Sequence, residues 1–199
     1  MASRRFRDAA VSEPVLETPR LVLRLPVAAD IEGWASFMSD ETAMRHLSGP
    51  QPRLAAWRAM AAVRGSWALY GFGMFAVIER ATGHWVGRVG PWCPEGWPGT
   101  EIGWGFLPAV WGRGYATEAA SAAMDFAVGV LGWREVVHVI APENTASAAV
   151  AARLGAVKRG PTRLPDPFHE VAVELWGQSA EAWRRRRTTA GNFQAAPAV

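Results

Sequence analysis

The chain of 199 residues is poor in cysteine and contains no long apolar run. The only cysteine, Cys93, excludes an internal disulfide framework and any metal site built from several cysteines. No stretch approaches the roughly 20 apolar residues that cross a membrane, and the N-terminal MASRRFRDAAVSEP has arginines without a following apolar segment. We therefore expect a cytoplasmic protein with no signal peptide, no membrane partner and no metal.

The excess of one charge sign is also small, with a formal net charge of +3. Much of the positive charge lies near the ends, at Arg4, Arg5 and Arg7 and in the four arginines of 184–187. A basic run of this kind can bind nucleic acid, but it is more often a solvated tail. The interior has no basic stripe interleaved with stacking aromatics. Nucleic-acid binding is therefore not the leading hypothesis, and we assign it at most to the basic C-terminal extension.

Length and apolar periodicity indicate a single domain, with loosely held residues at 1–15 and a flexible tail at 188–199. The pattern predicts strands at 21–25, 72–79, 84–92, 100–107, 134–141 and 169–176, and helices at 28–38, 52–69, 115–131 and 145–153. Short connections favour antiparallel strand pairs, and the later alternation of strand and helix favours helices packed on a sheet. We therefore expect an α/β (α+β) fold with a mixed sheet.

The stretch EIGWGFLPAVWGRGYATEA joins a strand to the most convincing helix of the chain. Alternate residues of the strand are large and apolar, which predicts a core face: Ile102, Trp104 and Phe106. The opposite face carries one carboxylate and two glycines: Glu101, Gly103 and Gly105. Because glycine has no side chain, another group can approach the backbone closely on this second face.

Small residues follow the strand where the helix begins, in WGRGYAT at 111–117. The first N–H groups of a helix lack internal partners and carry the positive end of the helix dipole, so small residues there would leave an accessible anion site. The alternative is that the glycines only make the turn and that Thr117 or Glu118 satisfies the helix start. The junction matches neither GxxxxGK[ST] nor GxGxxG, and composition alone leaves both interpretations open.

The same segment resembles motif A of the GNAT superfamily of acyl-CoA-dependent N-acyltransferases. WGRGYATEA followed by ENTASAAVAARLGA is similar to the RimJ/RimL branch, which includes ribosomal-protein N-terminal acetyltransferases, and so is the opening LETPRLVLRLPVAADIEGW. The resemblance extends over 15–177 and implies a single domain there, with extensions at 1–14 and 178–199, of which the second is basic. In the superfamily pattern [Q/R]xxGx[G/A], Gly114 and Ala116 match, whereas Trp111 departs from the usual first residue.

The resemblance implies acetyl-CoA as co-substrate and a GNAT-like sheet that splays between its fourth and fifth strands, 100–107 and 134–141. The pyrophosphate would lie on the backbone amides of the junction, which belong to Gly112, Arg113, Gly114, Tyr115, Ala116 and Thr117. The pantetheine arm would bond to the backbone of Phe106 and Leu107 and reach the splay. Asn144 matches an asparagine that contacts this arm in the family.

Direct transfer to a primary amine, either a protein N-terminus or a small molecule, requires a base. We favour Glu101, because it shares a strand face with the two glycines; the alternative is a structural or substrate-orienting carboxylate. His138 is the rival base, although a lone histidine in a strand is more often structural. No cysteine or serine nucleophile with a paired base is evident, which favours direct attack in a ternary complex.

The departing thiolate also needs a partner. Many family members supply a tyrosine in the helix after the asparagine, but the matching position here is Ala151. Ser147 matches a serine typical of the branch, and our hypothesis is that it hydrogen-bonds the sulfur; the alternative is a cap serine bonded to local backbone. The missing tyrosine keeps a second hypothesis open, a non-catalytic acyl-CoA-binding module with a regulatory or interaction role.

The acceptor pocket is the least determined part of the site. The resemblance implies that its walls come from 28–64 and 161–168, where the large side chains are Trp34, Met38, Trp57, Trp67 and Phe168. A tryptophan-rich wall would suit an apolar or aromatic acceptor or a cation, although each ring is more often a core residue. The sequence leaves the acceptor, the acyl-chain preference and a homodimer open.

Overall fold

The computed structural model describes residues 13–189, so that Arg4, Arg5 and Arg7 and the tail at 190–199 lie outside the described residues. The strands are β1 (Leu16–Glu17), β2 (Leu21–Arg24), β3 (Phe75–Glu79), β4 (Trp85–Trp92), β5 (Glu101–Phe106), β6 (Glu135–Ile140), β7 (Val157–Thr162) and β8 (Val173–Ser179). The α-helices are α1 (Ile31–Ser39), α2 (Glu41–Met44), α3 (Arg53–Tyr70), α4 (Tyr115–Gly129), α5 (Thr145–Leu154) and α6 (Ala180–Thr189), and two short 3-10 helices are η1 (Ala28–Asp30) and η2 (Pro108–Val110). Among these described helices, none is both long and apolar enough to cross a membrane.

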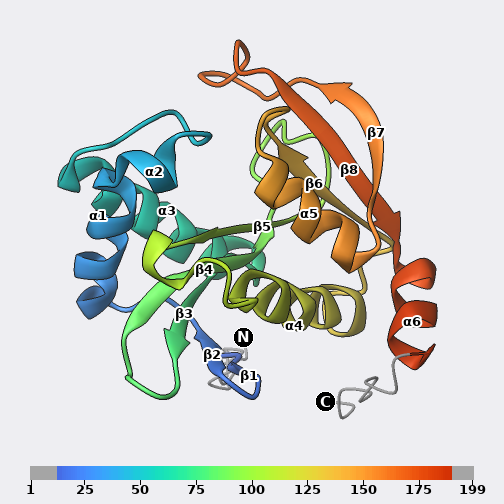
Figure 1. Cartoon of the computed structure of the whole chain (residues 1–199), viewed down its shortest axis with the longest axis horizontal. Coiled ribbons are helices and arrows are strands. Elements are labelled where there is room, and N and C mark those ends of the chain that lie inside the picture. The colour runs from blue at the N-terminus through green and yellow to red at the C-terminus, as the bar shows by residue number, and fades with distance from the viewer. Residues whose placement is uncertain (1–12, 190–199) are drawn as a thin grey trace, which may run out of the picture.

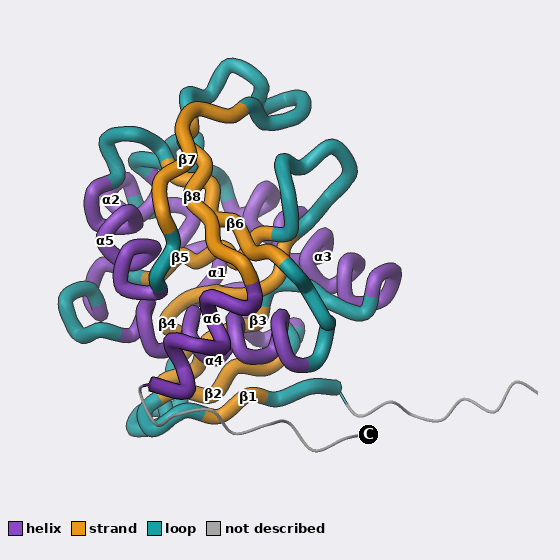
Figure 2. Tube along the Cα trace, turned by 90° about the vertical axis from the view of Figure 1, so that its right-hand side faces the viewer, coloured by secondary structure: helices purple, strands orange, loops and turns teal. Residues whose placement is uncertain are grey.

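The strands of the described chain form one sheet in the order β1-β2-β3-β4-β5-β6-β8-β7 (Figure 1). Neighbouring strands are antiparallel except for β5 and β6, which run parallel and pair at Glu101 and Val137. Beyond this pair the two strands separate (Figure 1). Figure 2 shows the strands as one band with helices on either side. The predicted mixed, mostly antiparallel sheet is therefore confirmed, and its opening lies between the fourth and fifth predicted strands.

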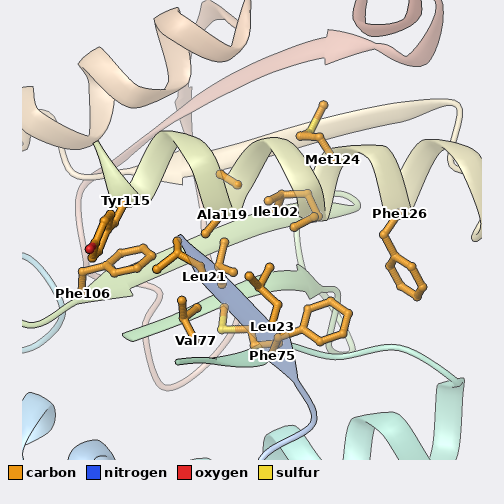
Figure 3. Close-up of a cluster of buried hydrophobic side chains, with 14 of the residues drawn as sticks. Leu21, Leu23, Phe75, Val77, Ile102, Phe106, Tyr115, Ala119, Met124 and Phe126 are labelled. Atoms are coloured by element: carbon orange, nitrogen blue, oxygen red, sulfur yellow. The ribbon is translucent and has the colours of Figure 1, made fainter. Parts of the chain in front are cut away.

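Helix α4 covers one face of the sheet (Figure 3). The inward side of the helix consists largely of fully buried alanines: Ala119, Ala120, Ala123 and Ala127. Larger buried side chains of the strands fill the space beneath it: Leu21, Leu23, Phe75, Val77, Ile102 and Phe106. The predicted core face of β5 is thus confirmed for Ile102 and Phe106, whereas Trp104 is only partly buried and packs beside α5.

Helix α1 covers the opposite face, and α3 packs against α1. The rings of Trp34 and Phe37 on α1 lie 5.8 and 6.2 Å from the ring of Trp85 on β4. A Cβ atom added to Gly105 would come within 2.6 Å of the Phe37 ring, so only glycine lets α1 approach β5 this closely. The expected close approach to the glycine face of β5 is therefore made by a helix of the protein itself.

The edge strand β7 was not expected from the sequence. It contains Gly160 and Pro161, and most of its side chains are exposed, so it lacks the alternation of apolar and polar residues on which strand prediction depends. Its partner β8 begins at Val173, later than the expected strand at 169–176.

Helix α6 was also unexpected, because its residues were assigned to the basic extension. Trp183 is 2% exposed, and its indole N–H donates to the Asp125 carboxylate of α4 at 2.9 Å. Arg187 forms an ion pair with the same carboxylate at 2.5 Å, and Arg186 donates to a backbone carbonyl of α5 at 2.7 Å. The run at 184–187 is therefore part of a docked helix, whereas the sequence alone favoured a solvated tail.

Replacing Trp183 with alanine should lower the free energy of unfolding by about 3–5 kcal/mol, because it removes a large buried ring. Chemical denaturation followed by circular dichroism measures this change. The control is Arg185→Ala, which removes only an exposed pair with Glu181 and should leave the stability unchanged. A Trp183→Ala protein as stable as the parent would contradict the docking of α6.

Candidate active site

The backbone between β5 and α4 passes twice through left-handed conformations. Gly112 has a φ of 74° and Gly114 a φ of 79°, values that cost other residues about 1–2 kcal/mol. Gly114 is the N-cap of α4, and no side chain caps the helix there, so neither Thr117 nor Glu118 plays that part. Among the hydrogen bonds within residues 13–189, none is donated by the backbone N–H groups of 112–117. These groups form the donor set that a pyrophosphate requires.

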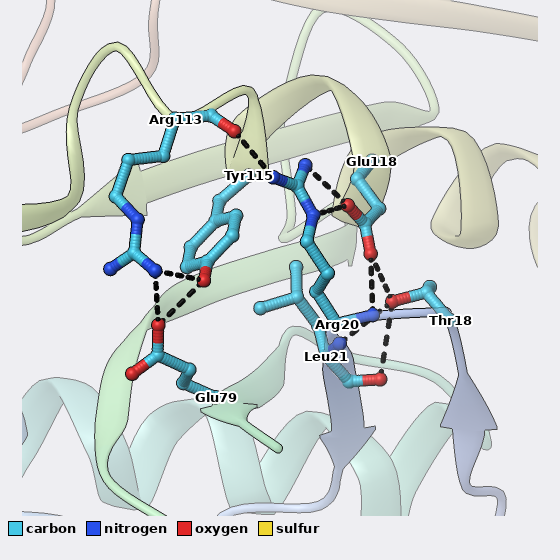
Figure 4. Close-up of polar contacts among 7 residues, drawn as sticks. All are labelled: Thr18, Arg20, Leu21, Glu79, Arg113, Tyr115 and Glu118. Carbon is cyan, nitrogen blue, oxygen red and sulfur yellow. Dashed lines mark hydrogen bonds and ion pairs between the residues drawn. The ribbon is translucent and has the colours of Figure 1, made fainter. Parts of the chain in front are cut away.

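The side chain of Arg113 turns away from these amides toward β3 (Figure 4). Its guanidinium lies 2.7 Å from the Glu79 carboxylate and donates to the Tyr115 hydroxyl at 2.6 Å. The Tyr115 hydroxyl donates in turn to Glu79 at 2.5 Å, and this bond, together with one from Thr82 and the charge of Arg113, lowers the pKa of Glu79. We therefore expect Arg113 to act on a bound phosphate through its backbone N–H rather than its guanidinium.

A second arginine, Arg20, holds the loop from the other side (Figure 4). Its guanidinium donates to the Arg113 carbonyl at 2.8 Å and to the Glu118 carboxylate at 2.6 Å. Burial opposes the ionisation of Glu118, but hydrogen bonds from Thr18 and Arg20 outweigh it and lower the pKa. The Tyr115 ring lies 4.7 Å from one guanidinium and 4.5 Å from the other. Side chains from distant parts of the sequence thus hold the junction in place.

The strand end expected to hold the pantetheine arm already makes contacts of its own. The Phe106 carbonyl accepts from the Trp111 indole N–H at 2.9 Å, and the Leu107 N–H donates to the Val86 carbonyl at 3.0 Å. The Trp111 side chain is 46% exposed, so it can move without uncovering the core. Pantetheine binding to Phe106 and Leu107 stays a prediction, in which the arm uses a second carbonyl lone pair or takes the place of the indole.

Glu101 lies at the start of β5 and is 7% exposed. Its carboxylate accepts from the Trp97 indole N–H at 2.6 Å and from the Val139 backbone N–H at 3.2 Å. Burial raises the pKa of Glu101 to about 7, although these two hydrogen bonds and the charge of Arg88 act in the opposite direction. A carboxyl group with such a pKa changes its protonation state near neutral pH, which suits a general base.

His138, the rival base, lies on β6 with 1% exposure. Its Nδ1 is 2.7 Å from the Ile102 carbonyl oxygen, which can only accept, so Nδ1 carries the proton. Burial lowers the pKa of His138 to about 4 against the opposing effect of this bond. The imidazole is therefore neutral at pH 7 and a weaker base than Glu101, and its ring bridges the opening between β5 and β6.

Asn144 and Ser147 lie at the start of α5, where Ser147 contacts Trp104 of β5. The Asn144 side-chain oxygen caps the helix by accepting from the Ser147 backbone N–H at 3.0 Å, which leaves the amide NH₂ able to donate to a ligand. The Ser147 hydroxyl accepts from the Trp104 indole N–H at 3.3 Å and keeps its own proton to donate. Ala151, where the family has a tyrosine, is fully buried, and Trp104 packs against the small cluster that contains it.

The large side chains expected around the acceptor have different surroundings. Trp34, Met38 and Trp67 are at most 8% exposed and belong to the main core. Trp67 lies 4.9 Å from the Phe75 ring, which places it in the core rather than in a pocket wall. Trp57 is 55% exposed and lines a surface hollow of about 510 Å³ between α1 and α3. Phe168 is 41% exposed on the loop before β8. Of these five side chains, only Trp57 and Phe168 are therefore accessible to a ligand.

A family model described as the acetyltransferase (GNAT) domain matches residues 20–157. The chain belongs to this family. The match includes β5, the glycine turns, the start of α4, and Asn144 and Ser147 at the start of α5. Membership supports acetyl transfer as the general activity of this GNAT protein.

Known proteins with similar sequences or structures extend the comparison. The chain is 28% identical over 156 residues to the uncharacterised N-acetyltransferase YoaA of Bacillus subtilis (strain 168). The aligned region covers 75% of this chain and 86% of YoaA. It is 34% identical over 88 residues to the uncharacterised protein YkkB of the same organism, covering 43% of this chain and only 51% of YkkB. The crystal structure of an acetyltransferase from Agrobacterium tumefaciens str. C58 is similar with a TM-score of 0.75 and 30% identity, over 84% of this chain and 95% of that one.

Two residues near the predicted site were not singled out as hydrogen-bond donors by sequence reasoning. Trp97, in the turn PEGWPG, donates to Glu101, and Trp104, which was assigned to the core face, donates to Ser147. No spacing or motif distinguishes these two indoles from the other tryptophans. Within the part of the chain that the structure describes, no three His, Cys, Asp or Glu side chains lie together as metal ligands would.

Gly114→Ala should weaken acetyl-CoA binding about tenfold, because the added Cβ disfavours the left-handed N-cap that orients the amides. Isothermal titration calorimetry measures the dissociation constant. Gly129→Ala is the matched control: this glycine ends the same helix, has no left-handed backbone, and its Cβ would meet open space. Equal affinities for the two variants would contradict the role of the turn in binding.

Proposed function

We propose that the protein transfers an acetyl group from acetyl-CoA to a primary amine by direct attack in a ternary complex. The arrangement of functional groups along β5 and the turn that follows it supports this proposal most strongly. The strand begins at a buried carboxyl group with a pKa of about 7 and leads into a turn whose N–H groups, among the described residues, have no partners. A base and an anion site therefore belong to one short segment of chain.

In this proposal the amides of 112–117 bind the pyrophosphate, and the Asn144 amide and the backbone of Phe106 and Leu107 orient the pantetheine arm. Acetyl-CoA supplies a thioester whose carbonyl carbon accepts the amine and whose thiolate leaves. Glu101, as carboxylate, removes the proton that the attacking nitrogen loses, either directly or through water.

Ser147 acts on the leaving group. Its hydroxyl donates to the sulfur as the carbon–sulfur bond breaks, and the bond from the Trp104 indole orients the hydroxyl oxygen for this. Trp104 also occupies space next to Ala151, where a tyrosine would otherwise reach the sulfur. We infer that a serine oriented by an indole replaces the tyrosine of other family members.

We also place the protein in the RimJ/RimL branch, on the strength of WGRGYATEA and ENTASAAVAARLGA. This makes a protein N-terminus one candidate acceptor beside small amines. The alternative function is a non-catalytic acyl-CoA-binding module, which is favoured by one observation: the tyrosine position is the fully buried Ala151.

The proposal is tested by calorimetric titration with acetyl-CoA, followed by measurement of free thiol release over a panel of amines and peptides. Binding together with amine-dependent release supports the transferase. Binding without release from any acceptor supports the acyl-CoA-binding module. The absence of binding would contradict both functions.

The maximal rate should rise with pH through about 7, because Glu101 must lose its proton before it can act as base. Glu101→Gln should lower the maximal rate about 100-fold or more and remove this limb of the pH profile. Initial rates at saturating acetyl-CoA measure both effects, and an unchanged dissociation constant for acetyl-CoA shows that the variant is folded. An unchanged maximal rate would exclude Glu101 as the base.

Ser147→Ala should lower the maximal rate about tenfold, the effect of losing one hydrogen bond to a developing charge, without changing the affinity for acetyl-CoA. Thr145→Ala, in the same first turn but exposed, is the control and should retain the parental rate. A Ser147→Ala protein with the parental maximal rate would show that Ser147 has only a structural role at the start of α5.

A further inference from the structure

Arg88 on β4 differs from the other arginines near the sheet. Arg24 and Arg113 form ion pairs with Asp30 and Glu79, at 2.7 Å in both cases. Among the hydrogen bonds and ion pairs of residues 13–189, none involves the Arg88 guanidinium, and its Nε is buried without a partner. A guanidinium offers five N–H donors. Only the Nε is both buried and unpartnered, which is costly, whereas Arg88 as a whole is half-buried, so its terminal NH₂ groups remain accessible to a ligand.

The surroundings of Arg88 are aromatic. The centre of its guanidinium lies 5.7 Å from the Trp34 ring and 5.5 Å from the Phe37 ring, both on α1. These rings stabilise the cation from their faces but accept no conventional hydrogen bonds. The edge of the guanidinium is therefore left for another partner. Arg24 lies in the same cross-strand row as Arg88. Its partner Asp30 is not available to Arg88, because both oxygens of the Asp30 carboxylate already accept from Arg24.

Strand pairing places Arg88 on the same face as the proposed base. Arg88 is opposite Gly105 and Trp92 is opposite Glu101, so alternation brings both charged side chains to the α1 face of the sheet. Burial lowers the pKa of Arg88 to about 10, while the charge of Glu101 raises it. The guanidinium thus remains charged at neutral pH, and the charges of Arg88 and Glu101 each shift the pKa of the other.

We propose that Arg88 binds a carboxylate of the acceptor, so that the substrate is a primary amine that also carries a carboxylate group. This inference rests on the proposed function. Glu101 receives the proton of the amine, while the planar guanidinium of Arg88 donates two parallel hydrogen bonds to the carboxylate and selects for it. The rings of Trp34 and Phe37 hold the guanidinium in position for this contact.

The test compares acceptors that differ only in charge. One series consists of ω-amino acids from glycine to 6-aminohexanoate, each paired with its amide. A second consists of peptides with Asp or Glu next to the N-terminus, paired with Asn or Gln. The wild-type protein should prefer the carboxylate member of at least one pair about tenfold or more in kcat/KM, the effect expected for a hydrogen-bonded charge pair.

Arg88→Gln should abolish this preference, and Arg88→Lys should retain part of it. Arg58→Gln, which removes an exposed arginine of α3, is the matched control and should keep the full preference. Rates are compared well above the pKa of Glu101, because loss of the Arg88 charge raises that pKa. A purely structural Arg88 would change stability or the rate for both members of a pair equally, and that result would overturn the proposal.

A second measurement is independent of turnover. Isothermal titration calorimetry of the protein–CoA complex with the same carboxylate and amide pairs reports binding without turnover. Carboxylate-selective binding that Arg88→Gln removes supports the inference even if no acetyl transfer occurs, in which case only the proposed function fails. Acetyl transfer with no selectivity for a carboxylate in either acceptor series overturns the inference and leaves the proposed function intact.

Discussion

Strands β5 and β6 run parallel, pair at Glu101 and Val137, and then separate, and the candidate site depends on how this opening is filled. In a continuous parallel ladder the facing backbone groups would bond to each other. Here side chains replace those bonds: Glu101 accepts from the Val139 N–H, and His138 donates to the Ile102 carbonyl. Both side chains lose water in doing so, and their pKa values move to about 7 and about 4. The need to satisfy two open strand edges thus produces the candidate base.

The candidate anion site at the start of α4 depends on side chains that hold the junction without bonding to its backbone N–H groups. Arg113 and Arg20 hold the junction through Glu79, Tyr115 and Glu118, with the two guanidinium groups on either side of the Tyr115 ring (Figure 4). Because carboxylates pair with both guanidinium groups, the positive field at the loop comes mainly from the amides of the helix start, which have no partner within residues 13–189. The amides can then meet a phosphate without a prior rearrangement of the turn.

Much of the fold could be predicted from local patterns. The alternation in EIGWGF predicts both faces of β5, because burial of one face by α4 imposes a period of two. Periodicity could not predict β7, which is an exposed edge strand, or α6, whose sequence is basic and whose burial rests on Trp183. The surroundings of Trp67 were equally hidden, since a tryptophan in a core and one in a pocket wall share the same local sequence.

The sequence by itself determined the family, the glycine turns, and the face on which Glu101 lies, because each of these is encoded within a few neighbouring residues. Only the tertiary structure decided the pKa of Glu101, the proton position on His138 and the lack of a partner for Arg88 among the described residues. These properties arise from desolvation and pairing by groups far apart in the chain, such as Trp97 and Val139 around Glu101 or Trp34 and Phe37 around Arg88. Electrostatic interactions depend on distance in space, and distance in space follows from the packing of the whole sheet and its helices.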